Sequence, residues 1–333
     1  MPDSIPLKGR GVSSDGAFEK VIAAQAKAHR LAEEVKALRK DRKGLLQEFN
    51  AITTARPVPH SPLIARRKAK AETVRVCCGD VHGMRMDRDC IAAFLRDLKM
   101  LDPDGIVLGG DILECGGHLA RHQPIGYIAL CDYTYVEDLN AANWFLDEVQ
   151  TAAPHAVIHA IQGNHEQRVE RWCVDECMGN GREAAFLESV YGPETRLRFK
   201  ERGIQWYKKS EIYHEGLPRG WIKLGSMYFT HELGTSANAA RQAVMKTGGN
   251  VTFFHTHRED SATVVLPATG LVKAFNPGCL SQMQPIWKHS DPTTWSQGYG
   301  IDFILKSGAF QRVHAPIWRG ESVTSAMIER FKS

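Results

Sequence analysis

The chain has 333 residues, of which 43% are hydrophobic and 24% charged, and its formal net charge is +4. This composition is typical of a globular protein with a buried core and excludes a disordered chain; eight cysteines in so long a chain are not a disulfide framework. Because no run of 18 apolar residues occurs and the N-terminus lacks the apolar core of a secretory signal, we expect no membrane contact and a cytoplasmic location.

Residues 1–56 are predicted to form a long helix. Between Val21 and Ile52 apolar residues recur at alternating steps of three and four, with Arg42 in the one remaining seam position. Such a heptad-like seam with charged residues on the other faces is typical of a coiled coil, which would make the chain a homo-oligomer. The alternative is a single amphipathic helix that packs against its own catalytic domain.

A linker is predicted over residues 57–72. It contains prolines and then a basic cluster of arginines and lysines between Arg66 and Lys70. Prolines interrupt regular structure, and a run of like charges stays in solvent. Solvated chain is the favoured interpretation, and contact with nucleic acid is the alternative.

Residues 73–333 are predicted to form an α/β catalytic domain. The strand-like runs TVRVCCGD, DGIVLGGD and HAVIHAIQGNHE alternate with helical runs, two of which cover 89–98 and 139–152. This alternation indicates strands that emerge at one edge of a sheet. The later runs GSMYFTHE, VTFFHTHR and GLVKAFNPGCL, and a hairpin in YGIDFILKSGAFQRVHAPIW, indicate a second sheet packed on the first.

Potential metal ligands follow five of these strands. In an extended chain residues i and i+2 point to the same side, so Asp80 and His82 can converge on one point. Carboxylate, amide and imidazole groups together suit divalent Mn, Fe, Zn, Co or Ni, and eight groups are too many for one ion but about right for two. Two such metals can clamp a phosphoryl displacement and activate water. The eight groups are Asp80, His82, Asp111, Asn164, His165, His231, His255 and His257.

The order of these motifs resembles that of the calcineurin-like metallophosphoesterases. Asp80-Val-His82, Gly110-Asp111, Gly163-Asn164-His165-Glu166, His231 and His255-Thr-His257 all occur in the expected order over about residues 74–258. The resemblance implies a sandwich of two β-sheets flanked by helices, with a dinuclear site at the strand ends. It implies one metal on Asp80, His82, Asp111 and His257, and a second on Asp111, Asn164, His231 and His255. Mn²⁺ is favoured for both, with Fe, Zn, Ni, Co or Mg as alternatives.

The resemblance gives His165 a catalytic role. In the family this histidine lies near the scissile phosphate as general acid or transition-state stabiliser, which suits an imidazole near neutral pH; orienting a neighbour is the alternative. Because GGDILECGG lacks the Asp-Arg-Gly of the family's protein phosphatases and both histidines of His-x-His are present, we expect a phosphodiesterase using a metal-bound hydroxide. Its substrate would be nucleic acid, a cyclic nucleotide or another small diester. A phosphomonoesterase for nucleotides or proteins is the first alternative, and an inactive DNA-binding scaffold the second.

Other residues are candidates for substrate contact. The long loop 114–135 follows Asp111, and its His118 and His122 are four residues apart; Tyr127 is a candidate either for base stacking or for helix packing. Arg168 and Arg258 are placed to meet a phosphate. Equally, Arg168 could form a salt bridge with Glu170 or Glu201, and Arg258 one with Glu259 or Asp260. Phe254 stands where the family usually has glycine. The segments HAVIHAIQGNHEQRVERW, AFNPGCLSQMQP and WSQGYGIDF resemble phosphoesterases of bacteriophages and prophages, which implies a host bacterial cytoplasm.

Overall fold

The structure, a computed structural model, describes residues 72–123, 125–285 and 293–332 together with five isolated N-terminal residues. By its internal contacts the chain divides into two units, Met1–Pro57 and Val58–Ser333. In the first unit the described residues are helical and exposed, and they are Lys27, Arg30, Leu31, Glu33 and Lys36. The rest of the predicted N-terminal helix, its coiled-coil seam and nearly all of the 57–72 linker lie outside the described residues.

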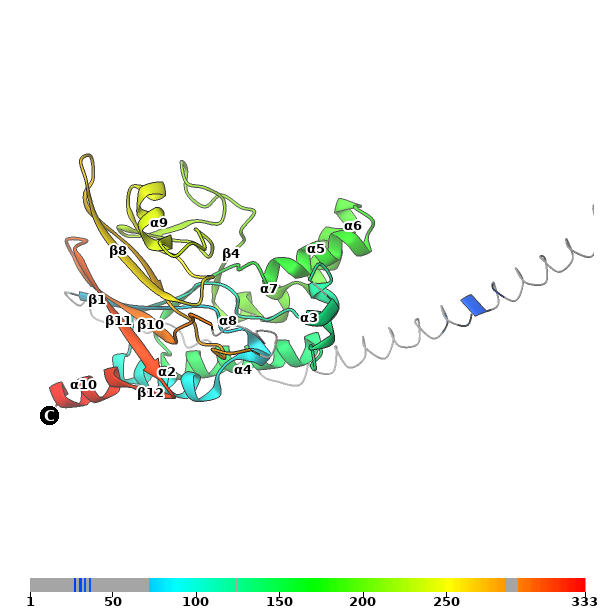
Figure 1. Ribbon diagram of the computed structural model, residues 1–333, viewed down its shortest axis with the longest axis horizontal. Helices are drawn as coiled ribbons and strands as arrows, with labels where there is room; N and C mark the ends of the chain where they lie inside the picture. The colour runs from blue at the N-terminus through cyan, green and yellow to red at the C-terminus, as the bar shows by residue number, and fades with distance from the viewer. Residues whose placement is uncertain are drawn as a thin grey trace, which may run out of the picture. The chain divides into compact units, whose positions relative to one another are not determined.

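The larger unit contains a seven-stranded sheet in the order β12-β11-β10-β1-β2-β3-β4 (Figure 1). Strands β1 to β4 are parallel, and β10 runs antiparallel to β1 with Val76 opposite Ile301. The predicted hairpin is confirmed as β10–β11. The strands are β1 (Glu72–Cys78), β2 (Gly105–Leu108), β3 (Val157–Ile161), β4 (Gln205–Tyr207), β10 (Gly298–Leu305), β11 (Phe310–Trp318) and β12 (Glu321–Ser322).

A second sheet of five strands has the order β5-β6-β7-β9-β8. Strand β7 pairs in parallel with both β6 and β9, so β6 and β7 end at the same edge, while β5 and β8 at the two sides of the sheet are antiparallel to their neighbours. The strands are β5 (Ile222–Leu224), β6 (Met227–Phe229), β7 (Asn250–Thr252), β8 (Glu259–Leu266) and β9 (Gly270–Pro277). The predicted α/β architecture with two sheets is therefore confirmed.

Helices cover the outer face of each sheet. The larger sheet carries α2 and α4, where Phe94 of α2 meets Phe145 of α4 and Tyr299 of β10. Helix α9 packs on β8 and β9 of the smaller sheet (Figure 1). The helices are α2 (Arg88–Leu101), α3 (Ile125–Ala129), α4 (Tyr135–Ala152), α5 (Glu166–Glu176), α6 (Gly181–Tyr191), α7 (Pro193–Arg196), α8 (Phe199–Arg202), α9 (Ala239–Thr247) and α10 (Val323–Lys332), with single 3₁₀ turns η1 (Gly83–Arg85) and η2 (Gly117–Ala120).

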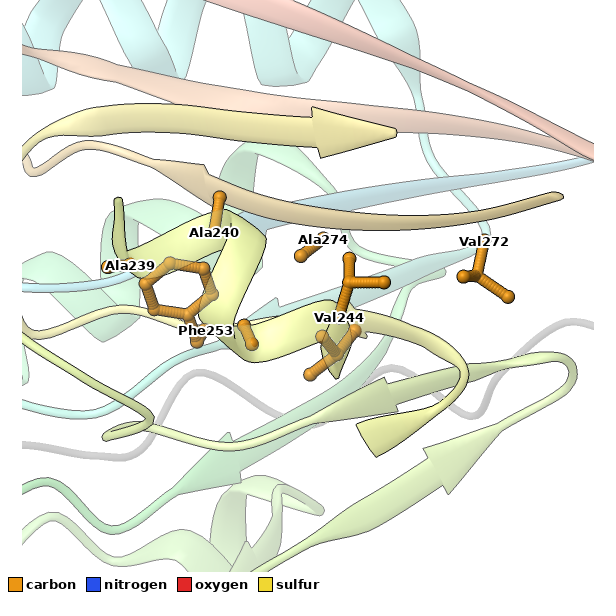
Figure 2. Packing of buried hydrophobic residues seen from close by; sticks show 8 residues of the cluster. Ala239, Ala240, Val244, Phe253, Val272 and Ala274 are labelled. Atoms are coloured by element: carbon orange, nitrogen blue, oxygen red, sulfur yellow. The ribbon is translucent and has the colours of Figure 1, made fainter. Parts of the chain in front are cut away.

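The α9 face is lined by small residues, which lets the helix lie close to the sheet. Figure 2 shows Ala239, Ala240 and Val244 of α9 in one cluster with Phe253 and with Val272 and Ala274 of β9. No described helix is long and apolar enough to cross a membrane.

The space between the two sheets is filled by a second apolar cluster that includes Phe254. Its other members come from both sheets: Cys77, Val107 and Ile161 from the larger sheet, and Ile222, Met227 and Phe229 from the smaller. Phe254 is fully buried against two glycines, because a Cβ at Gly109 would lie 2.2 Å from its ring and one at Gly79 would lie 2.8 Å away. At this position, where the resemblance to metallophosphoesterases leads us to expect glycine, the chain places a ring over two glycines instead.

This packing predicts a large stability effect. Phe254→Ala should lower the free energy of unfolding by about 3–5 kcal/mol, because it removes a fully buried ring and leaves a cavity between the sheets. Phe186→Ala, at a site that is 67% exposed, is the matched control and should change it by less than about 1 kcal/mol. Chemical denaturation measures both, and similar values for the two variants would contradict this account of the core.

Candidate metal centre

The candidate ligands lie where strands of the two sheets end. Asp80 and His82 follow β1, Asp111 follows β2 and Asn164 follows β3, and these three parallel strands are neighbours. The smaller sheet contributes His231 after β6, and His255 and His257 after β7. Since parallel neighbours end at the same edge, the strand topology brings groups that are far apart in sequence to one place.

The backbone turns sharply at most of these positions. Five of the candidate ligands adopt left-handed φ angles, which are uncommon for residues other than glycine and cost on the order of 1–3 kcal/mol each. Such strain persists where surrounding structure enforces it, and it gathers at functional sites. The residues are Asp80 (φ 52), His82 (φ 58), Asp111 (φ 51), His255 (φ 74) and His257 (φ 56).

A first cluster consists of Asp80, His82, Asp111 and His257, whose ligand atoms all lie within 4.8 Å of one another. The Nε2 atoms of His82 and His257 are 2.9 Å apart. Two nitrogens at right angles on one metal, each about 2.1 Å from it, are about 3 Å apart, so this spacing is that of neighbouring ligands. Asp80 Oδ1 is buried without a hydrogen bond and lies 3.3 Å from His257 Nε2. The cluster therefore fits a cation.

A second cluster joins Asp111 to His231 and His255. His231 Nε2 lies 3.3 Å from Asp111 Oδ2 and 2.9 Å from the side-chain oxygen of Asn164. Asp111 thus belongs to both clusters.

Two of these histidines are fixed by a hydrogen bond at the other ring nitrogen. His231 Nδ1 lies 2.8 Å from the Gly109 carbonyl oxygen, and His82 Nδ1 lies 2.6 Å from Glu114 Oε2. An acceptor at Nδ1 keeps the proton there and leaves Nε2 as the ligand atom, a common arrangement around protein-bound metals. The Glu114 contact has the length of a charge-assisted hydrogen bond, so we interpret it as orienting His82.

Glu166 holds the loops that carry Asp111 and Asn164. Its buried carboxylate accepts hydrogen bonds from the backbone N–H groups of Asp111, Leu113 and Gly163 at 2.8–3.0 Å. Gly163 has no room for a side chain, because a Cβ there would lie 2.1 Å from Asp111 Oδ1. The glutamate of the Gly-Asn-His-Glu motif is therefore a scaffold, a role that sequence reasoning did not assign.

Nearby carboxylates raise the pKa of two of these histidines when no cation is bound. Burial lowers the pKa of His231, but Asp111 and then Asp80 outweigh it and raise that pKa to about 9. Burial likewise opposes protonation of His257, and Asp80 raises its pKa well above the usual value. Protonated imidazoles thus balance the buried carboxylates, and a divalent ion would displace these protons.

The metal-free protein should lose stability in alkaline solution. A histidine whose pKa is raised on folding stabilises the protein fully below its unfolded pKa of about 6.5, and the contribution is lost as pH rises through the folded value. For His231 that window extends from 6.5 to about 9. We expect the melting temperature of metal-stripped protein to fall between pH 6.5 and 9, and to fall less with saturating Mn²⁺. Scanning calorimetry at both pH values measures this, and an equal fall with and without metal would contradict it.

His165 and Arg168 lie beside the two clusters. His165 Nδ1 is 2.7 Å from the Glu114 carbonyl oxygen, and its Nε2 is 3.9 Å from Asp111 Oδ2. Arg168 Nη2 donates to His165 Nε2 at 2.9 Å. Burial lowers the pKa of His165, but the Asp111 and Glu114 carboxylates outweigh it and the net shift is upward, with Arg168 opposing. The salt bridges of Arg168 with Glu170 or Glu201 that the sequence left open are not formed: Glu170 contacts Gln162 and Glu201 contacts Arg198.

A family model described as calcineurin-like phosphoesterase matches residues 75–307, which is more than half of the chain and includes all the candidate ligands. The chain belongs to the calcineurin-like phosphoesterase family. Members are metal-dependent phosphoesterases, so the Asp and His clusters described above are the expected kind of site.

The solved structures that match this chain are distant from it. A conserved uncharacterized protein and predicted phosphoesterase from Streptococcus pneumoniae TIGR4 is 14% identical with a TM-score of 0.26, covering 74% of this chain and 99% of that one. Vacuolar protein sorting 29 from Cryptosporidium parvum is 11% identical with a TM-score of 0.33, covering 76% and 95%. No curated protein matches the sequence.

The phosphoesterase centre opens into a pocket of about 230 Å³. Besides the clusters, its walls include Arg85, Tyr127, Arg168, Gln282 and Trp295, and the Trp295 ring lies 4.0 Å from that of His257. Tyr127 and Arg168 thus reach the centre from the loop and from α5.

Three residues proposed from sequence for substrate contact lie outside this set. His118 packs edge-on against Trp172, with ring centroids 5.6 Å apart. His122 is exposed, and Arg258 donates to the Ser236 carbonyl oxygen at 2.8 Å. For these three, contact with a larger substrate remains a prediction.

Proposed function

We propose that the protein is a dinuclear-metal phosphodiesterase. The observation that carries this proposal is the position of Asp111 in both ligand clusters, which suits a pair of ions bridged by one carboxylate. Asp80, His82, Asp111 and His257 would hold one ion, and Asp111, Asn164, His231 and His255 the other. Manganese is the metal we favour, because mixed oxygen and imidazole ligands suit it, with Fe, Zn, Ni, Co and Mg as alternatives.

The roles of the protein groups follow from their placement. A bound metal pair supplies charge neutralisation at the phosphate and lowers the pKa of water. Asp111 and Asn164 would hold those ions beside His165. His165 lines the pocket, with its Nδ1 held by the Glu114 carbonyl oxygen and its Nε2 accepting from Arg168. As an imidazolium released from Arg168, it would deliver the Nε2 proton to the leaving oxygen.

The preference for diesters rests on how the nearest guanidinium is used. Arg168 Nη1 donates to the carbonyl oxygens of Glu114 and Cys115, at 3.0 and 3.3 Å, and Nη2 donates to His165. Because these N–H groups already donate to protein atoms, Arg168 is poorly placed to bind the second negative charge of a monoester dianion. A diester carries one negative charge fewer and does not need a guanidinium to bind it.

A phosphomonoesterase is the second candidate, favoured by the presence of two arginines in the pocket wall. Arg85 lines the pocket and pairs with Asp132, which is exposed, at 3.0 Å. If Arg85 turned inward with Arg168, the pocket would offer two guanidinium groups to a dianion.

Relative rates on two model substrates distinguish these functions. Metal-stripped protein reloaded with Mn²⁺ should hydrolyse bis-p-nitrophenyl phosphate with a higher kcat/KM than p-nitrophenyl phosphate. The opposite order would replace the diesterase proposal with the phosphatase one. If the diester is preferred, cyclic nucleotides and DNA or RNA strands should be compared next as natural substrates. That comparison also tests the proposed nucleic-acid partner.

A further inference from the structure

The loop after β2 contacts the surroundings of the metal centre through the side chain of Tyr127. Tyr127 lies on α3, is half-buried and lines the pocket. Its hydroxyl donates a short hydrogen bond to Glu114 Oε1 and accepts one from Arg168 Nη1 at 3.3 Å. Tyr127 therefore contacts two groups that themselves contact His82 and His165.

Glu114 connects the phenol to a candidate ligand. The carboxylate is 1% exposed, and its other oxygen, Oε2, lies 2.6 Å from His82 Nδ1. Tyr127 is the one described side chain that donates to Oε1. Without the phenol, Glu114 would keep its bond to His82 but lose the contact that fixes the plane of its carboxylate. The direction in which His82 Nε2 points would then be less well defined.

The charge and burial of Glu114 make this contact consequential. A buried carboxylate needs hydrogen bonds to both oxygens, and the loop supplies the second of them. The Tyr127 hydroxyl thus completes the environment of the group that orients His82.

We propose that Tyr127 is a positioning residue for the metal centre, acting through Glu114 on His82. This inference rests on the proposed function, because it takes His82 to be a metal ligand. It gives the long loop between β2 and α4 a definite role, because Tyr127 of α3 supports Glu114 and, through it, His82. Tyr127 itself touches neither metal nor substrate in this role.

The test is a double-mutant cycle on metal binding, with Mn²⁺ titrated calorimetrically into metal-stripped protein. Direct partners of metal-bound histidines are worth about 10- to 100-fold in affinity, so Glu114→Ala should weaken the affected site by that factor. Tyr127→Phe, one step further out, should weaken it by roughly threefold to tenfold. In the Glu114→Ala background, Tyr127→Phe should have no further effect, since its route to His82 is gone.

A matched control separates positioning from loss of a buried hydroxyl. Tyr135→Phe removes a hydroxyl that donates to the Tyr191 carbonyl oxygen at 3.0 Å, away from the centre, and should leave Mn²⁺ affinity unchanged. Wild-type affinity in Tyr127→Phe would overturn the inference, as would a full additional loss in the double variant. Failure of the wild-type protein to bind two Mn²⁺ ions would instead overturn the proposed function, so the two failures are distinguishable.

Discussion

Asp111→Asn should abolish metal binding and phosphoester hydrolysis together. The substitution keeps the shape of the side chain but removes its charge, and Asp111 is the carboxylate common to both clusters. Its Oδ2 lies 3.3 Å from His231 Nε2, while its Oδ1 accepts the His165 backbone N–H at 2.9 Å. Since even outer partners of metal ligands are worth 10- to 100-fold, we expect a bridging ligand to cost more than about 100-fold in turnover.

Metal content and turnover are measured on the same preparation. Asp175→Asn is the control, because that carboxylate is 58% exposed and pairs only with Arg121 among the described ion pairs. It should keep both metals and full activity. An Asp111→Asn protein that retained two ions and wild-type turnover would remove Asp111 from the centre.

His165→Ala, in contrast to Asp111→Asn, should affect activity without affecting metal binding. We expect both metals to be retained and turnover to fall by about 10²- to 10⁴-fold. The ring contacts Arg168 and the Glu114 carbonyl oxygen, and it groups with His82 and Glu114 outside the two clusters that contain Asp111. If His165 is a general acid, the loss should be large for an alkoxide leaving group and small for p-nitrophenolate, which leaves without a proton.

That leaving-group dependence distinguishes an acid from a residue that only orients a neighbour. An orienting residue would lower the rate on both kinds of diester by a similar factor. His214→Ala, at an exposed position, is the control and should leave the rates on both kinds of diester unchanged. Unchanged turnover of His165→Ala on an alkyl diester would exclude His165 from the mechanism.

Much of the fold was predictable because the strands are short apolar runs with ligands directly after them. Asp80 and His82, then Asp111, follow runs that do form β1 and β2, and the parallel topology brings them together. The helix predicted over 89–98 is present as α2, with about a turn more at its C-terminal end. Helices α6 to α8 were not predicted, because no motif or clear period marks that part of the sequence.

The supporting residues could not be read from the sequence. Glu114, Tyr127 and Glu166 act through single side-chain contacts across loops, and such contacts leave no periodic pattern. The one available signal was positional, since Glu114 and Glu166 stand within the motifs that carry the ligands. Arg168 was left open between phosphate and salt bridge, and the structure gives a third answer, two loop carbonyls and His165.

Phe254 is a second kind of residue whose role could not be predicted from the sequence. From sequence it was a departure at a position where the family usually has glycine, with no account of how the turn would be built. Its ring fills the space over Gly79 and Gly109, two residues far away in sequence. The phage resemblance, the N-terminal coiled coil and the oligomer it would form stay predictions.

The central claim is that two metals share Asp111. The most direct test is anomalous diffraction from crystals of the full-length protein loaded with Mn²⁺. We predict two peaks about 4 Å apart, one among Asp80, His82 and His257 and the other among Asn164, His231 and His255, with Asp111 between them. A single peak, or two peaks that do not share Asp111, would contradict the claim.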